Sequence, residues 1–433
     1  MTAMPGPFRQ SVFAAPPRAR EEPYRHADGR DDPFHWLRDP AYPEVNDKRV
    51  LDHLAAENAY ADAVLGGEGD PRPALLEEFK ALVVPDETAP PEWIHGRWYG
   101  FRFRAGQEYP SWYRRDALDG PETTILDANV EAVGKPFYAV RGWAVSPDHR
   151  RLAILDDRDG SERLRLRVRD LATGADIHEG AAACAPGLAW SADSATLFYV
   201  RQDDKQRPRW VHRHTLGATG DDPLVYEESD PGFFLGIGET ASGRFLQIES
   251  AAKNSSETRL LPLGAPAAAP TLVLARRDDH EYDVVDRGDE LLIRTNDRHL
   301  NFRLVRAPLA DPREANWTEV VPGRDDVFIA GFGAARDFWW LTERAEGLKR
   351  VRVVEGGHRD MSAGRIVAFP DPAYTISVAG GRQWDRRTLR LVYQSPARPS
   401  TWYDYDVPAA RLDELQATRV PGHDPADYVV DRL

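Results

Sequence analysis

From about residue 92 onward, apolar and charged residues alternate in short segments, which is typical of β-strands with one solvent-facing side. The clearest segments are residues 97–104, 164–169 and 349–353, where Val, Leu, Tyr, Phe or Trp alternates with Arg. Clusters of Gly, Pro, Asp and Asn separate such segments, as expected of turns. The pattern predicts many short antiparallel strands and gives no sign of a βαβ alternation.

One unit recurs along this β-rich region, a polar turn followed six residues later by an apolar strand. It is clearest where residues 146–148 precede Leu152 and where residues 191–193 precede Leu197. Six copies start at residues 146, 191, 240, 286, 334 and 383, and an earlier one starts near residue 92. A spacing of 45–49 residues between the six matches propeller blades, whereas a β-sandwich needs about 100 residues per unit. The repeat therefore predicts a mainly β chain with a seven-bladed β-propeller over residues 79–427.

The first 78 residues follow a different pattern. Residues 32–40 form a Pro-bounded extended segment, and residues 43–65 place apolar side chains every three or four positions, as in an amphipathic helix. Gly66 and Gly67 would end that helix, and a second short helix is expected over residues 73–83. We therefore expect residues 1–78 to form an extended and helical N-terminal arm, and residues 428–433 to start a connection to a further domain.

Composition narrows the possible classes of protein. The 433 residues are 42% hydrophobic and 10% aromatic, which is ample for a packed interior. The net charge of −14 disfavours nucleic-acid binding. Cys184 is the single cysteine, so no intrachain disulfide can form, and neither a secretory signal nor a stretch of roughly 20 apolar residues is evident. The expectation is a cytoplasmic protein without a membrane partner, cofactor or metal.

Several segments resemble the prolyl oligopeptidase family, and within it the oligopeptidase B branch. Residues 32–39 (Asp-Pro-Phe-His-Trp-Leu-Arg-Asp) and 54–60 are similar to the opening of that family. Further similar segments, in the family's order, are residues 108–110, 126–129, 145–148, 294–296, 301–304 and 399–406. The resemblance spans almost the whole chain.

The resemblance implies a propeller that caps an α/β-hydrolase domain holding the catalytic Ser, Asp and His. The arm, with Trp36 and Leu37, would pack at the interface with that domain. Because residues 428–433 lie about where family members leave the propeller, the resemblance covers the accessory half only. It implies the substrate-gating part of a serine peptidase that hydrolyses short peptides after Arg or Lys, partnered by a hydrolase domain in cis or in trans. The alternative is a stand-alone β-propeller that binds partners or serves as a scaffold.

The chain's own residues give little sign of chemistry, and we predict no catalytic residue in it. No serine has Gly at both −2 and +2, as a nucleophile elbow requires. Ser362 comes nearest, with Gly364 after it but Asp360 before it. We therefore expect Ser362 to be an ordinary loop serine.

Other residues that could suggest a binding site are better explained by the structure of the blades. His212 and His214 share a strand face and could bind a metal, but no third ligand is evident, so exposed strand histidines are expected. Residues 278–281 (Asp-Asp-His-Glu) are expected in a solvated loop between blades. Trp339 and Trp340 fit blade packing. The arginines of residues 163–169 and 349–352 are expected on solvated blade faces.

Overall fold

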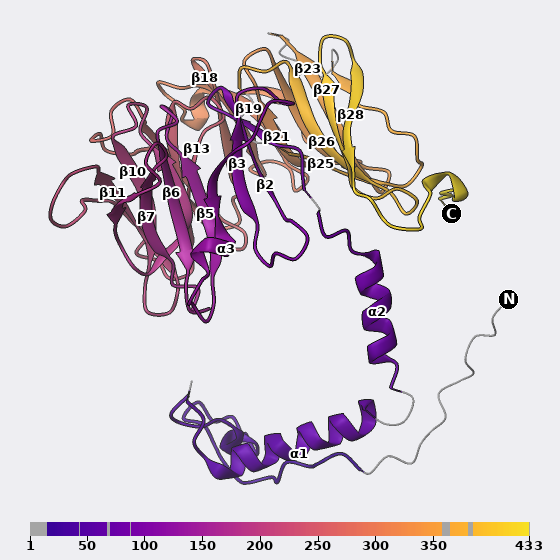
Figure 1. Ribbon diagram of the computed structural model, residues 1–433. Helices are drawn as coiled ribbons and strands as arrows, with labels where there is room; N and C mark the ends of the chain where they lie inside the picture. Colours follow the sequence, from indigo (N-terminus) through magenta and orange to yellow (C-terminus); the bar gives the residue numbers. More distant parts are fainter. Residues whose placement is uncertain are drawn as a thin grey trace. The chain divides into compact units, whose positions relative to one another are not determined.

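The computed structural model describes residues 15–42, 44–66, 70–86, 88–356, 364–379 and 384–432. It divides into two compact units, Met1–Val83 and Val84–Leu433. Figure 1 shows the helices of the first unit and the strands of the second. The predicted boundary at residue 78 falls inside the second helix, because that helix continues to Leu82.

The first unit contains a short 3-10 helix η1 (His35–Leu37) and the helices α1 (Lys48–Leu65) and α2 (Arg72–Leu82). α1 begins later than the predicted residue 43 because Asp47 caps it, accepting a hydrogen bond from the Arg49 backbone N–H. Gly66 ends α1. Val50 is the only fully buried residue of the two long helices.

The second unit is a seven-bladed β-propeller, which confirms the predicted fold. Each blade is a four-stranded antiparallel sheet whose strands pair in sequence order. Blade 1 contains β1 (Glu92–Ile94), β2 (Arg97–Arg102), β3 (Ser111–Arg115) and β4 (Thr123–Asp127). Blade 2 contains β5 (Ala139–Val145), β6 (Arg151–Asp157), β7 (Arg165–Asp170) and β8 (Asp176–Glu179). Blade 3 contains β9 (Cys184–Trp190), β10 (Thr196–Gln202), β11 (Pro208–Thr215) and β12 (Leu224–Glu227). Blades 1 and 2 are joined through the helical turn α3 (Ala128–Glu131).

The remaining blades follow the same plan. Blades 4 and 5 contain β13 (Phe234–Glu239), β14 (Phe245–Ala251), β15 (Ser256–Pro262), β16 (Thr271–Leu274); and β17 (Tyr282–Arg287), β18 (Glu290–Thr295), β19 (Arg303–Pro308), β20 (Thr318–Val321). Blades 6 and 7 contain β21 (Val327–Ala334), β22 (Phe338–Ala345), β23 (Leu348–Glu355), β24 (Arg365–Ile366); and β25 (Thr375–Val378), β26 (Thr388–Gln394), β27 (Thr401–Asp406), β28 (Arg411–Ala417). Two 3-10 turns, η2 (Glu314–Asn316) and η4 (Pro425–Asp427), complete the described elements.

The sequence repeat corresponds to one structural element, the turn between the first and second strands of a blade. Leu152, Leu197 and Leu246, each six residues after the start of a copy, lie in β6, β10 and β14 and are completely buried. Residue 383, where the last copy starts, lies outside the described residues. The repeat is visible in the sequence because this second strand is covered on both faces and tolerates only apolar side chains there.

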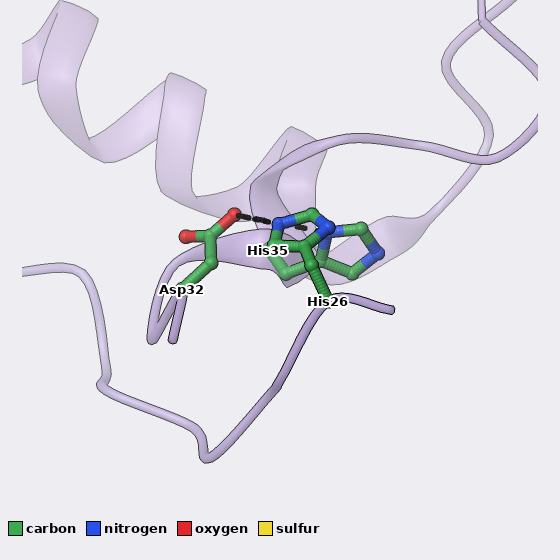
Figure 2. A group of neighbouring side chains, drawn as sticks. All are labelled: His26, Asp32 and His35. Carbon is green, nitrogen blue, oxygen red and sulfur yellow. Dashed lines mark hydrogen bonds and ion pairs between the residues drawn. The ribbon is translucent and has the colours of Figure 1, made fainter. Parts of the chain in front are cut away.

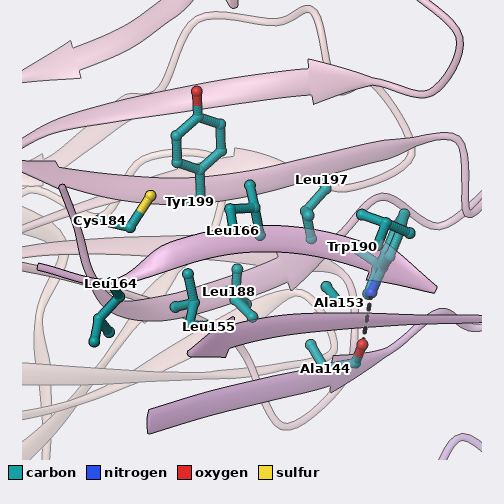
Figure 3. Packing of buried hydrophobic residues seen from close by; sticks show 11 residues of the cluster. Ala144, Ala153, Leu155, Leu164, Leu166, Cys184, Leu188, Trp190, Leu197 and Tyr199 are labelled. Carbon is teal, nitrogen blue, oxygen red and sulfur yellow. Dashed lines mark hydrogen bonds between the residues drawn. The ribbon is translucent and has the colours of Figure 1, made fainter. Parts of the chain in front are cut away.

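Hydrocarbon side chains fill the boundaries between consecutive blades. Separate apolar clusters lie at each boundary from blades 1 and 2 to blades 6 and 7. Figure 3 shows the one between blades 2 and 3, where Leu155 and Leu166 face Leu188 and Trp190. The Trp190 indole N–H donates to the Ala144 carbonyl at 3.0 Å, so this large ring is fixed in position.

The boundary between blades 7 and 1 is built differently. Arg390 of β26 forms a buried ion pair with Asp404, at 2.8 and 3.0 Å, and also donates to the Pro91 carbonyl at 2.7 Å. The Arg386 guanidinium lies over the ring of Trp98, 4.6 Å from its centroid. Within the described chain no strand is shared between these two blades, so side chains close the ring.

No helix within the described segments is long and apolar enough to cross a membrane.

Candidate functional site

The first strands of the blades line the axis of the propeller. β5 contacts β9, β9 contacts β13, and β17 contacts β21, whereas the fourth strands lie at the outer edge of each sheet. In this architecture the first strands surround a central channel. Side chains that meet in this channel can therefore come from blades that are far apart in the sequence.

A polar contact links non-neighbouring blades at one end of the first strands. His95 lies in the β1–β2 turn of blade 1, and its Nε2 is 3.6 Å from Oε2 of Glu239, the last residue of β13 in blade 4. Because blades 1 and 4 are not adjacent in the ring, this contact crosses the channel. His149 supports the turn, with Nε2 2.9 Å from the His95 carbonyl and Nδ1 2.8 Å from the Tyr99 hydroxyl.

A cavity of about 300 Å³ opens beside Glu239. It is lined by Gly236, Ile237, Gly238, Glu239, Gln247 and Glu249. Gly236 pairs with Glu249 and Gly238 with Gln247 across β13 and β14. A Cβ added at either glycine would meet no atom within 4 Å, so the two missing side chains leave space in front of an amide and a carboxylate.

Glu249 is the most unusual group of this cavity. Burial raises the pKa of its carboxyl, and the negative charge of Asp283 raises the pKa further. Asp283 itself is paired with Arg294, 2.6 Å from Nη2. Among the described residues Glu249 forms no hydrogen bond or ion pair, so a positively charged ligand group would supply its missing partner. In the sequence, the two alternating glycines of this strand, Gly236 and Gly238, are the feature that could have indicated the cavity.

The two histidines singled out in the sequence both contact Asp222. His212 Nδ1 lies 3.1 Å from the Asp222 carbonyl, and His214 Nδ1 lies 2.8 Å from the Asp222 carboxylate. The expectation that both are exposed is wrong for His214, which is buried where His178 of blade 2 stacks on its ring at 3.8 Å.

Other candidates are also placed by blade packing. Ser362 lies outside the described residues. His280 is buried and bonded to Thr295 Oγ1 at 2.8 Å, so the predicted solvated loop 278–281 is wrong at this residue. Cys184 is buried, which raises the pKa of its thiol to about 12 and excludes a reactive thiolate.

The tryptophans and one of the arginines singled out in the sequence also lie in blade strands. Trp339 is buried between blades 5 and 6, as blade packing predicted, and Trp340 is partly buried against the core between blades 6 and 7. Arg167 contradicts the expected solvated face, because it is buried against Asp156, at 2.9 Å, and Glu131, at 3.0 Å.

The arm presents an apolar surface. Leu75, Leu76 and Phe79 of α2 are 44%, 52% and 64% exposed, and with Pro73 they line a shallow hollow of about 640 Å³. Trp36, in contrast, is half-buried, and its indole N–H donates to the Arg20 carbonyl of the same arm at 2.7 Å. Among the described residues, only His26, Asp32 and His35 of the arm stand close enough together for three side chains to hold one metal ion.

Comparison with known proteins identifies the fold's relatives. Residues 16–418 match the sequence profile of the prolyl oligopeptidase N-terminal β-propeller domain. The chain is 33% identical to dipeptidyl aminopeptidase BI of Pseudoxanthomonas mexicana, over 98% of this chain and 61% of that protein. It is 29% identical to Protease 2 of Moraxella lacunata, over 92% of this chain and 57% of that protein.

Solved structures agree with these matches. Oligopeptidase B from Leishmania major superposes with a TM-score of 0.87 at 25% identity, covering 97% of this chain and 63% of that one. Oligopeptidase B from Trypanosoma brucei gives 0.82 at 26% identity, covering 98% and 60%. The chain thus spans about three fifths of the length of these relatives. It belongs to the prolyl oligopeptidase family and carries that family's N-terminal β-propeller domain.

Proposed function

We propose that this chain is the arm and substrate-gating propeller of an oligopeptidase B-like serine peptidase that hydrolyses short peptides after Arg or Lys. Hydrolysis takes place in an α/β-hydrolase domain, joined in cis or associated in trans. The observation that carries the proposal is the family match over residues 16–418, and the exposed apolar face of α2 adds support.

The arm is the docking surface for the hydrolase domain in this proposal. Burying a large apolar side chain stabilises an interface by about 1.5–3 kcal/mol. Leu75, Leu76 and Phe79 are half exposed on one helix, and monomers seldom leave such a surface uncovered. These three side chains alone could therefore contribute several kcal/mol to association.

Gating is supported by the channel contacts. The His95–Glu239 pair links non-neighbouring blades at one end of the first strands, and such a contact restricts the channel in this proposal. Folded proteins are excluded sterically. The preference for Arg or Lys draws support from the unpaired Glu249 carboxylate and from the net charge of −14.

Co-expression of this chain with the hydrolase half of a relative tests the proposal. We expect the chain alone to leave an Arg-containing chromogenic peptide intact and the pair to cleave it. The double variant Leu75→Ser/Phe79→Ser should abolish association in pull-down and remove activity. Lys80→Ser, on the charged side of the same helix, is the matched control and should change neither.

Two results would count against the proposal. One is peptide turnover by the lone chain that survives removal of the arm. The other is equal association by the wild type and by the Leu75→Ser/Phe79→Ser variant, which would favour a stand-alone binding module.

A further inference from the structure

A small hairpin in the arm brings three metal-ligand side chains to one side. The Arg25–Asp31 bridge sets the pairing of its two strands, and the turn between them passes through Gly29 with φ +88°. The His26 N–H donates to the Arg30 carbonyl at 2.8 Å, and the Asp32 N–H donates to the Tyr24 carbonyl at 2.9 Å. Side chains two residues apart on such strands share a face, so His26 and Asp32 meet diagonally.

The chain then turns back and adds a third ligand. Pro33 ends the hairpin, and the 3-10 helix η1 starts with His35, whose N–H donates to the Asp32 carbonyl at 3.2 Å. The His35 ring stacks flat on Tyr24, with 3.5 Å between ring centroids and 4° between planes. The His26 ring stands almost perpendicular to His35, at 87°. Both imidazoles are therefore oriented by aromatic contacts.

Figure 2 shows the resulting group. Asp32 Oδ2 lies 3.2 Å from His26 Nε2 and 3.7 Å from His35 Nδ1, and the three ligand atoms all lie within 4.8 Å of one another. Ligands of tetrahedral zinc, at bond lengths of about 2.0–2.2 Å, stand about 3.3–3.5 Å apart. The two carboxylate–imidazole distances bracket that spacing.

We propose that His26, Asp32 and His35 form a zinc-class binding site on the N-terminal arm. Two imidazoles and one carboxylate are ligands that suit Zn²⁺, Co²⁺ or Ni²⁺ better than Mg²⁺ or Ca²⁺, which prefer oxygen. The His26 side chain is 28% exposed, and those of Asp32 and His35 are each 38% exposed. Solvent therefore reaches the site, and a water molecule would complete the four ligands of a bound ion.

A bound ion would fasten the hairpin to η1. The direct contact between His26 and Asp32 already holds the two strands, so the metal adds the link from both of them to His35. Because the ion binds the native arm and not the unfolded chain, it stabilises the arm by an amount that grows with the logarithm of the free metal concentration above Kd.

The test is zinc titration of the full 433-residue chain, free of any affinity tag, by calorimetry. We expect one tight site per chain, lost or weakened by at least about tenfold in each of His26→Ala, Asp32→Asn and His35→Ala. His53→Gln removes another histidine of the same arm and should leave the affinity unchanged. Mg²⁺ should not compete.

Two further measurements locate the ion. Co²⁺ should give the visible absorption of a four-coordinate site in the wild type but not in the Asp32→Asn variant. Zinc should slow hydrogen exchange in residues 22–38 and leave the blades unchanged. The proposal is overturned if zinc binds no more tightly to the wild type than to the His26→Ala/His35→Ala variant. It is equally overturned if His212→Ala, in blade 3, is the substitution that removes the site.

Discussion

Leucine has two different environments in this chain. Leu152, Leu155 and Leu197 of the propeller are completely buried, whereas Leu75 and Leu76 of α2 are about half exposed. The blade leucines are covered because each repeat supplies the next with a complementary face. The arm lies outside the repeat, and the described part of α2 finds no such cover. The propeller thus carries its own core, whereas the apolar side chains of α2 stay exposed, in keeping with the proposal that they bind the hydrolase domain.

The largest effect is expected where two blades share one side chain. Trp190→Ala should lower the free energy of unfolding by about 3–5 kcal/mol, because it empties the space of a buried indole and removes the hydrogen bond from its N–H to the Ala144 carbonyl. Chemical denaturation measures the change. Leu76→Ala in the arm is the contrasting variant, expected to stay within about 0.5 kcal/mol of the wild type. Equal losses of unfolding free energy in the two variants would contradict the proposed difference between the propeller and the arm.

The boundary between blades 7 and 1 differs from both regions, because it is buried but formed by charged side chains. Arg390→Met should cost about 3 kcal/mol, since the buried Asp404 carboxylate would lose both hydrogen bonds from Arg390 and keep only Arg386, 3.9 Å away. The double variant Arg390→Met/Asp404→Leu should recover part of that loss. Arg411→Met removes an exposed pair with Asp413 and should cost less than about 1 kcal/mol. A double variant as unstable as Arg390→Met alone would contradict this account.

The smallest effect concerns Glu249 and depends on pH. Since the folded-state pKa is raised above the usual 4.5, the native chain keeps this proton where the unfolded chain has lost it. Stability therefore falls as pH rises from the ordinary value through the raised one. Glu249→Gln should be more stable than the wild type at about pH 8 and equal to it at about pH 3.5. Unfolding midpoints at the two pH values check this, and a difference of the same size at both would contradict it.

The sequence was sufficient for the fold because one structural element repeats. The polar segment before Leu152, Leu197 and Leu246 recurs along the sequence, and its period counts the blades without any knowledge of packing. The helices of the arm followed from apolar spacing, and only the start of α1 was misplaced, by the Asp47 cap.

Individual polar residues could not be placed the same way. His214 and Arg167 alternate with apolar neighbours as surface residues do, yet His178 of β8 and Glu131 of α3 help to bury them. The Glu249 cavity depends on two absent side chains opposite it. The His26–Asp32–His35 group depends on a hairpin followed by a turn, which no periodicity encodes.

The side-chain closure of the ring also has a mechanical meaning. Every blade is built from one continuous stretch of chain, so the first and last blades meet at a joint that no backbone hydrogen-bond ladder crosses. A force applied to the two ends of the propeller would be borne at that joint by Arg390, Arg386 and the Trp98 ring. Stretching should therefore part blades 7 and 1 before any sheet unravels. A circular permutant that joins the two ends and is cut between blades 3 and 4 would move the point of rupture to a hydrocarbon boundary.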